Sequence, residues 1–310
     1  MFRLVARLCG LLTLVIGGVL AICLAAAPIL PAGPQIAFMA NPAFNWDIYG
    51  LDLRTGVILR LTSAPFVQER YPDWSPDGER IAYHANPGRD YDLFVMDADG
   101  SNAQRLNLSL QITYFDEAMP DWSPDGTQLG FHSGTSDIGY NLFISDAGGM
   151  GFIPVTNGAG DFYHFNWSPS GEQIAFVGAY DRNEGIFLLD LGPGITSADD
   201  NMQRVEAVAE NGFFPAWSPD GQHIAFVSAR TGSEDIYLVD LANSAIRNLT
   251  NSPLADDTHP AWSADGRHIV FASNRGGTFD LYMMTSDGDN LRRLTYLYAD
   301  VLAPDWRPGS

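Results

Sequence analysis

The stretch Pro72–Gly78, which reads Pro-Asp-Trp-Ser-Pro-Asp-Gly, decides the fold because close copies of it return along the chain. Each copy carries a tryptophan, and these residues are Trp74, Trp122, Trp167, Trp217, Trp262 and Trp306. Their spacings are 48, 45, 50, 45 and 44 residues. A nearly constant period of this length is typical of proteins built from tandem structural repeats.

One repeat predicts four short antiparallel strands separated by turns. In the copy that begins at Phe214, Pro219 suits the second position of a type I turn and Gly221 suits its last position. The apolar and alternating segments of this copy place the strands at residues 214–218, 224–228, 235–240 and 245–250. Four-stranded units in tandem are typical of β-propeller blades. An elongated array would leave its terminal sheets uncovered, whereas a closed ring does not.

The two ends of the repeat region complete each other. The first copy of the second strand, at Ile36, has no tryptophan strand before it, and the last tryptophan strand, at Trp306, has no further strand after it. We therefore expect Ala303–Trp306 to form the innermost strand of the blade begun by residues 35–62. The sequence thus predicts an all-β, six-bladed β-propeller of four-stranded antiparallel blades over residues 34–310, closed by its C-terminal strand.

The composition limits the class of partner. The formal net charge is −20, and every cationic residue is an arginine because the sequence contains no lysine. Nucleic acid is disfavoured as a partner, since its phosphates need cationic contacts. The charge fits a cationic partner or divalent metal ions, and it also fits a domain that is merely well solvated.

Residues 1–33 predict a signal-anchor or a signal peptide followed by a short linker. Arg3 and Arg7 precede an uncharged apolar run over residues 8–30, whose 23 residues would span about 35 Å as a helix. The alternative, a cleaved signal peptide, usually has a shorter apolar region of about 7–15 residues. Both interpretations place the propeller outside the cytoplasm, in the periplasm or at the cell surface, as a single-pass anchored or secreted protein.

The repeat resembles the WD40-like (PD40) repeat of the TolB β-propeller family. The resemblance lies in Trp-Ser-Pro-Asp-Gly-x-x-Ile-Ala-Phe at residues 217–226 and Asp-Ile-Tyr at 235–237; it is greatest over 269–295 and covers 34–310. TolB itself carries an α/β domain before its propeller, where this sequence has the apolar run and linker. Related propellers accompany serine peptidase domains, but the sequence has no Gly-x-Ser-x-Gly nucleophile motif.

The loops that enter the tryptophan strands are long and rich in aromatic residues, and rigidly held loops commonly carry binding residues. Two sets of residues recur there at fixed spacing. Three residues before each tryptophan stand the members of a set that we call the collar: Tyr71, Met119, His164, Phe214, His259 and Ala303. Six residues before it stand the members of a second set, the rim: Gln68, Asp116, Asp161, Asn211, Asp256 and Asp300. We expect both sets near the mouth of the central channel, on the face away from the N-terminal tether.

The leading functional expectation is a non-catalytic scaffold that binds a protein or peptide of the cell envelope at this mouth. The alternative is a glycan or peptide lyase or hydrolase that uses His164, His259 and the rim acids as acid and base. A calcium ion on the rim is a third interpretation, which would require about 6–8 oxygen ligands. No other cofactor is expected. Side chains that simply fill the channel are the structural alternative, and His84 and His132 are expected to be packed rather than metal-binding.

Overall fold

The computed structural model describes residues 33–106, 116–135, 139–156, 161–180, 183–191, 202–204 and 211–309. The apolar segment predicted to be an anchor or signal peptide, with Cys9 and Cys23, lies outside these residues. Within the described part of the chain, no helix is long and apolar enough to span a bilayer.

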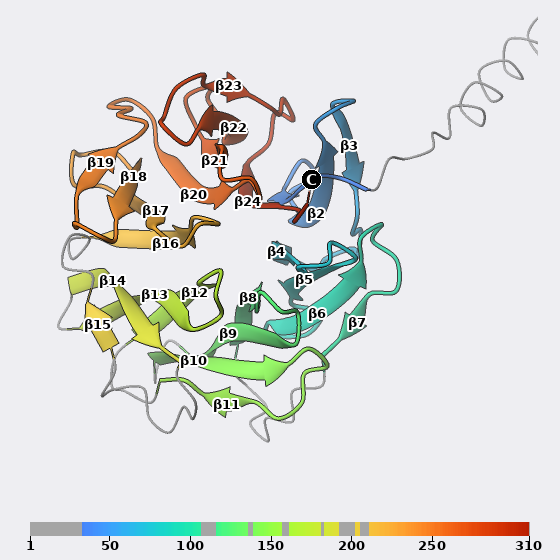
Figure 1. The fold of residues 1–310 in the computed structure, drawn as a ribbon. Helices are drawn as coiled ribbons and strands as arrows, with labels where there is room; N and C mark the ends of the chain where they lie inside the picture. Colours follow the sequence, from blue (N-terminus) through green and yellow to red (C-terminus); the bar gives the residue numbers. More distant parts are fainter. Residues whose placement is uncertain are drawn as a thin grey trace, which may run out of the picture. The chain divides into compact units, whose positions relative to one another are not determined.

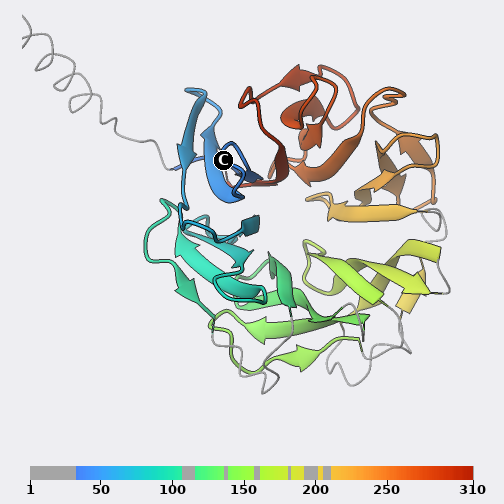
Figure 2. The ribbon, with the colours of Figure 1, turned by 180° about the vertical axis from the view of Figure 1, so that it is seen from behind.

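Six four-stranded antiparallel sheets form a ring, each sheet being one blade (Figures 1 and 2). The first three blades consist of β24 (Val301–Trp306), β1 (Ile36–Ala40), β2 (Asp47–Asp52) and β3 (Val57–Arg60); β4 (Glu69–Trp74), β5 (Arg80–Ala85), β6 (Asp92–Asp97) and β7 (Gln104–Arg105); and β8 (Asp116–Trp122), β9 (Gln128–Thr135), β10 (Gly139–Asp146) and β11 (Ile153–Pro154). The last three consist of β12 (Asp161–Trp167), β13 (Gln173–Tyr180), β14 (Asn183–Asp190) and β15 (Met202–Arg204); β16 (Gly212–Trp217), β17 (His223–Ser228), β18 (Asp235–Asp240) and β19 (Ile246–Asn248); and β20 (Asp257–Trp262), β21 (His268–Ser273), β22 (Asp280–Thr285) and β23 (Arg292–Arg293). The predicted six-bladed propeller is confirmed.

The ring closes where the sequence predicted. Strand β24 pairs with β1 in antiparallel register, with Trp306 opposite Ile36 and Val301 opposite Ala40. The backbone N–H of Arg307 donates to the carbonyl of Gln35 at 2.8 Å. Residues 35–307 therefore contain all the strands of the described residues together with the contact that closes the ring.

The second strand of each blade is buried on both sides, which explains its continuous apolar sequence. All five residues of β1 are buried, and its central aromatic, Phe38, stacks on Tyr49 of β2 with ring centroids 5.8 Å apart. The same aromatic position is fully or almost fully buried in all six blades, as Phe38, Tyr83, Phe131, Phe176, Phe226 and Phe271. These rings form the layer on which neighbouring blades pack.

The Ser-Pro-Asp-Gly segments are turns, and their aspartates have a structural role. In the copy after β4, the N–H of Gly78 donates to the carbonyl of Ser75 at 2.8 Å, and the Ser75 hydroxyl donates to Asp77 Oδ1 at 2.6 Å. This serine hydrogen bond is the main reason that the pKa of Asp77 lies below its usual value. Gly78 has φ +68°, a left-handed conformation that suits glycine.

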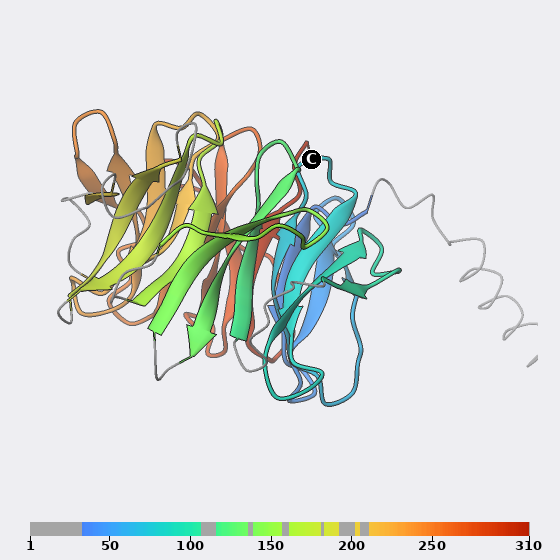
Figure 3. The same ribbon diagram turned by 90° about the horizontal axis from the view of Figure 1, so that it is seen from below.

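The strands run from one face of the ring to the other (Figure 3). One face carries the Ser-Pro-Asp-Gly turns and the hairpins between third and fourth strands, and we call it the turn face. The other carries the loops between second and third strands and those that enter each innermost strand, and we call it the loop face. The propeller begins at Pro34 and Gln35, beside Arg307, and therefore on the turn face.

Candidate binding site in the central channel

A β-bulge in the middle of every innermost strand creates the collar. The pairing of β4 with β5 shifts register between Arg70 and Asp73, and the same shift recurs in the other five blades. All six collar residues have left-handed backbone conformations, with φ between +47° and +54°. Such a conformation is uncommon for residues other than glycine, and a bulge redirects the side chain that it carries. The bulge therefore turns one side chain per blade into the channel.

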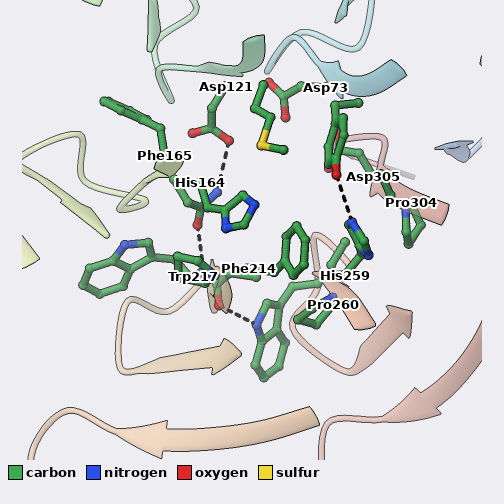
Figure 4. Close-up of a pocket in the computed structure, with 18 of the residues that line it drawn as sticks. Asp73, Asp121, His164, Phe165, Phe214, Trp217, His259, Pro260, Pro304 and Asp305 are labelled. Atoms are coloured by element: carbon green, nitrogen blue, oxygen red, sulfur yellow. Dashed lines mark hydrogen bonds between the residues drawn. The ribbon is translucent and has the colours of Figure 1, made fainter. Parts of the chain in front are cut away.

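The collar side chains stack on one another inside the channel (Figure 4). The ring of Phe214 lies 4.0 Å from that of His164 and 3.8 Å from that of His259, measured between centroids. His259 Nε2 lies 3.4 Å from the Tyr71 hydroxyl, which carries the contact on to the second blade. The structure thus brings four collar side chains into one connected layer.

A cavity of about 260 Å³ lies beside this layer. Its walls are the collar and the residues that follow it on each innermost strand, among them Pro72, Asp73, Asp121, Phe165, Trp217 and Pro219. Because these residues follow the collar toward the Ser-Pro-Asp-Gly turns, the cavity lies on the turn side of the collar.

The depth of the collar differs from the sequence-based expectation of a position near the mouth. Strand β4 begins at Glu69, and the other innermost strands begin similarly early. Tyr71 is therefore already inside the strand, and the same is true of the other collar residues. The bulge was the missing information, because it keeps the strand paired on both sides of the collar.

A further set of residues, which we call the inner ring, lines the cavity two positions after the collar. Its members are Asp73, Asp121, Asn166, Ala216, Ala261 and Asp305. Where the inner ring is polar, its side chains accept hydrogen bonds from the backbone of the next blade. Trp122 N–H donates to Asp73 at 2.6 Å and Trp167 N–H donates to Asp121 at 2.8 Å. Trp74 N–H donates to Asp305 at 2.7 Å, and Trp217 N–H donates to the Asn166 carbonyl oxygen at 2.9 Å.

The three inner-ring carboxyl groups hold protons more strongly than free aspartate does. Burial raises the pKa of Asp121 and of Asp305 to about 7. The pKa of Asp73 is raised well above its usual value, first by burial and then by the charges of Asp121 and Asp305. The three groups therefore act on one another across the channel, and a positive charge placed among them would favour their ionised forms.

The collar histidines are uncharged at neutral pH. Burial lowers the pKa of His259 to about 3, and it lowers that of His164 well below the usual value. Nδ1 of each ring has no hydrogen-bond partner within the described residues. Neutral imidazoles stacked on Phe214 behave chiefly as aromatic surface.

The rim residues lie at or just before the start of the innermost strands, and none of them lines the cavity. Asp116 accepts a hydrogen bond from Tyr91 N–H at 2.9 Å, and Asp161 accepts one from Tyr140 N–H at 3.1 Å. The same bond to the preceding blade recurs at 3.3 Å for Gln68, Asp256 and Asp300. Asn211 is exposed. These side chains join successive blades on the loop face.

The described residues contain no group of three or more His, Cys, Asp or Glu side chains arranged to hold a metal ion. His84 and His132 are buried, as expected of packed histidines. The Nδ1 atom of His84 accepts a hydrogen bond from Met119 N–H at 3.0 Å, which helps to fix the collar backbone.

Sequence reasoning missed the inner ring, although the signal was present. The residue between Pro and Trp is Asp in three copies of the repeat (residues 73, 121 and 305) and Ala in two (216 and 261). Asp73 stands two residues after Tyr71, and both line the cavity. The repetition of a carboxylate at this fixed distance from the collar was the signal that could have drawn attention to the inner ring.

Comparison with known proteins identifies the type of propeller. A family model described as the TolB β-propeller domain (PD40) matches residues 132–310, more than half of the chain. A search of curated protein sequences finds no match.

Several solved structures share the fold. TolB from Acinetobacter baumannii is 22% identical with a TM-score of 0.75, and the match covers 89% of this chain and 67% of that one. A protein described as putative TolB from Agrobacterium tumefaciens is 20% identical with a TM-score of 0.68, covering 84% and 88%. An oligogalacturonate lyase in complex with manganese is 18% identical with a TM-score of 0.57, covering 84% and 73%. At these identities the likeness concerns the fold alone.

Proposed function

Because the chain belongs to the TolB β-propeller domain (PD40) family, we propose that it is a non-catalytic scaffold whose channel binds a segment of another protein or a peptide. We place this scaffold in the cell envelope, outside the cytoplasm, where residues 1–33 anchor it or direct its secretion. The cavity on the turn side of the collar is the proposed docking site. Proteins of one fold differ in function, so the argument depends on the site rather than on the propeller.

The observation that carries the proposal is the uneven chemistry of the cavity wall. Asp73, Asp121 and Asp305 lie on one side, and Phe214, Trp217 and Trp262 contribute aromatic surface. Carboxylates bind ammonium and guanidinium groups through charge-assisted hydrogen bonds, and aromatic faces attract the same cations. We therefore expect the bound segment to insert a lysine or arginine side chain into the cavity.

The long-range charge of the protein supports the same choice of ligand. The formal net charge of −20 attracts a cationic segment and accelerates its encounter with the channel. Calcium remains the second proposed occupant of the acidic positions. The hydrogen bonds that already occupy the rim carboxylates favour the peptide over the metal ion.

The test is selection of a peptide display library on residues 33–310, followed by affinity measurements on the enriched peptides. We expect the enriched peptides to share a lysine or arginine. Its replacement by norleucine or citrulline should lower the affinity at least about tenfold, the order of one charge-assisted hydrogen bond. Affinity should rise between pH 5 and pH 8, because Asp121 and Asp305, whose pKa is raised to about 7, lose their protons in that range.

The matched variants are Asp73→Asn with Asp121→Asn, and Tyr71→Ala with Phe214→Ala and His259→Ala. Asparagine already occupies the inner ring at position 166 and accepts the same backbone hydrogen bond, so the first variant keeps the blade contacts. Loss of binding in both folded variants supports the proposal. Enriched peptides that lack a cation, or that bind the Asp→Asn variant equally well, contradict it.

An enzyme is the second candidate, and the raised pKa of Asp121 and Asp305 is the observation that favours it. Carboxyl groups with a pKa near neutrality are suited to proton transfer. Against this, each of them already accepts a backbone hydrogen bond from the next blade. Turnover of neutral oligosaccharides or peptides that disappears in Asp121→Asn would establish this candidate in place of the scaffold.

A further inference from the structure

Four large apolar side chains protrude from the loop face, away from the cavity. Phe44 is 99% exposed, Phe66 is 96% exposed, Leu254 is 99% exposed and Tyr298 is 94% exposed. We call these residues the tips. Phe44 lies between β1 and β2, and the other three lie in loops that enter β4, β20 and β24. All four therefore belong to the loop face of three consecutive blades, the sixth, first and second.

Three of the tips occupy one repeat position. Phe66, Leu254 and Tyr298 each stand eight residues before the tryptophan of their blade, at Trp74, Trp262 and Trp306. Two of these loops are structurally related as well, because the N–H of Val67 donates to the carbonyl of Ala64 and the N–H of Ala255 donates to that of Ser252. These two loops are tight turns in which Phe66 and Leu254 occupy the third position. The conformation of the turns therefore exposes these side chains, and a packing defect in the core does not explain their exposure.

The backbone at the tips is unfavourable for the residues that it carries. Phe44, Phe66 and Tyr298 have φ of +60°, +67° and +53°, in the left-handed region. Glycine or asparagine is the usual residue in this conformation, whereas a large aromatic side chain is strained there. Strain of this kind combined with full exposure gives the fold no benefit, and it points to a function at the tips.

The segments immediately around the tips carry no charged residue, although the protein is strongly acidic. Residues 41–46, 61–68, 249–255 and 294–299 contain no Asp, Glu, Lys or Arg, whereas the whole chain has 37 acidic residues and a net charge of −20. The loops end at Asp256 and Asp300, which accept hydrogen bonds from the preceding blade, and Arg89 and Asp90 lie on the same face of the second blade. The tips themselves are apolar and exposed, and exposed apolar residues of this kind are typical of contact with another apolar phase.

We propose that the tips insert into the interfacial layer of an uncharged (zwitterionic) lipid bilayer. Phenylalanine, leucine and tyrosine side chains partition favourably from water into that layer, and tyrosine suits its polar boundary. The separate, rigid turns can each enter a deformable surface without needing complementary pockets. This contact is independent of the peptide site, since none of the tips lines the channel cavity.

A second copy of the chain is a poorer occupant of the same face. Two propellers that each carry a net charge of −20 repel one another as they approach. An anionic membrane would repel the protein in the same way. The chemistry therefore selects a bilayer without net charge, and the binding should change little with salt concentration.

The test is flotation of residues 33–310, which contain the complete ring, with phosphatidylcholine vesicles and with vesicles that also contain phosphatidylglycerol. The variant is Phe66→Asn with Tyr298→Asn. Asparagine tolerates the left-handed conformation, so the melting temperature should stay equal or rise while vesicle binding falls at least about tenfold. A structural role for these side chains would lower the melting temperature instead and would contradict the proposal.

The matched control is Met150→Asn with Leu291→Asn. These side chains are 54% and 44% exposed on hairpins of the turn face. The control should float like the wild type, and the wild type should bind phosphatidylcholine at least as well as the mixed vesicles. The proposal is overturned if the wild type fails to float with phosphatidylcholine. It is also overturned if both variants bind alike, or if sedimentation shows a dimer that only Phe66→Asn with Tyr298→Asn dissociates.

Discussion

The inner ring consists of four polar positions and two alanine positions, and the two groups differ in how they contact the next blade. In the first four blades, Asp305, Asp73, Asp121 and Asn166 each accept the backbone N–H of the next tryptophan. In the last two blades alanine stands at this position and offers no side-chain acceptor. Trp262 donates its indole N–H to the Ala216 carbonyl at 3.1 Å, a bond that Trp167 also makes, to the Asp121 carbonyl at 3.2 Å. The propeller therefore closes with or without a side-chain acceptor.

This difference shows which features of the inner ring the fold requires and which it does not. Three carboxyl groups that are buried and close enough to affect one another's ionisation disfavour the folded state at neutral pH. Asn166 makes the same backbone contact without that cost. The asparagine and alanine positions indicate what the fold alone requires, and the proposed binding site accounts for the carboxylates.

The largest expected effect follows from removing one inner-ring side chain that bonds to the next blade, together with the strand that carries it. Deletion of residues 303–310 removes Asp305, Trp306 and most of β24, which pairs with β1 to close the ring. The first blade then loses its innermost strand and exposes the edge of β1, whose five residues are all buried. We expect aggregation or loss of the cooperative thermal transition, measured by calorimetry.

The point variant Asp305→Asn is the control for this deletion, because it keeps the strand and replaces only the carboxylate. It should unfold cooperatively, as the wild type does. A truncated protein that melts at the wild-type temperature would mean that the pairing of β24 with β1 is not needed for closure.

A smaller effect is expected from neutralising one carboxyl group, and it depends on pH. The pKa of Asp121 is about 7 in the folded protein and about 3.8 in a free side chain, so the folded state holds an extra proton between these values. Its contribution to stability is therefore complete below about pH 4 and is lost as the pH rises to about 7. The Asp121→Asn variant has no ionisable group at this position, so it does not lose this stability as the pH rises.

The free energy of unfolding of Asp121→Asn should thus exceed that of the wild type by a margin that grows from pH 4 to pH 7, reaching on the order of 4 kcal/mol. Urea unfolding at a series of pH values measures this margin. Titration of the collar histidines is common to both proteins and cancels in the difference. A margin that is constant with pH would contradict the raised pKa. Asp121→Ala should be less stable than Asp121→Asn by about 1 kcal/mol, since it leaves the Trp167 N–H without its acceptor.

The sequence predicted the ring and its closure because both depend on features that repeat. The tryptophan turn, the buried second strand and the unmatched ends recur or complement one another at a fixed period. It also identified the collar, since Tyr71, His164, Phe214 and His259 stand at one repeat position and meet in the channel. Features that repeat along the chain can be recognised from the sequence alone.

The depth of the site could not be predicted in the same way. A β-bulge is a local change of pairing with no distinctive residue here, since Tyr, Met, His, Phe and Ala all occupy the bulge position. The contacts of the rim could not be predicted for a related reason: Asp116 and Asp161 stand at one repeat position in the sequence, and each accepts a backbone N–H of the neighbouring blade. Which residue of a neighbouring blade a side chain contacts is determined only by the arrangement of the closed ring.

The smallest expected effect comes from introducing a hydrogen-bond acceptor at one of the two alanine positions of the inner ring. Ala216→Asn places at Ala216 the amide that Asn166 carries in the preceding blade. Its carbonyl oxygen should accept the backbone N–H of Trp262, as Asn166 accepts that of Trp217. We expect a gain of about 0.5–1.5 kcal/mol in the free energy of unfolding, the usual net value of one hydrogen bond. A matched loss, from Asn166→Ala, should be of similar size, and both changes in the free energy of unfolding are measured by urea unfolding at pH 7.

If Ala216→Asn destabilises the protein and Asn166→Ala does so too, the polar and alanine positions of the inner ring are not interchangeable. The alanines would then be required by the packing of Trp262 beside Ala216, and the asymmetry of the cavity would be part of the fold rather than an addition to it.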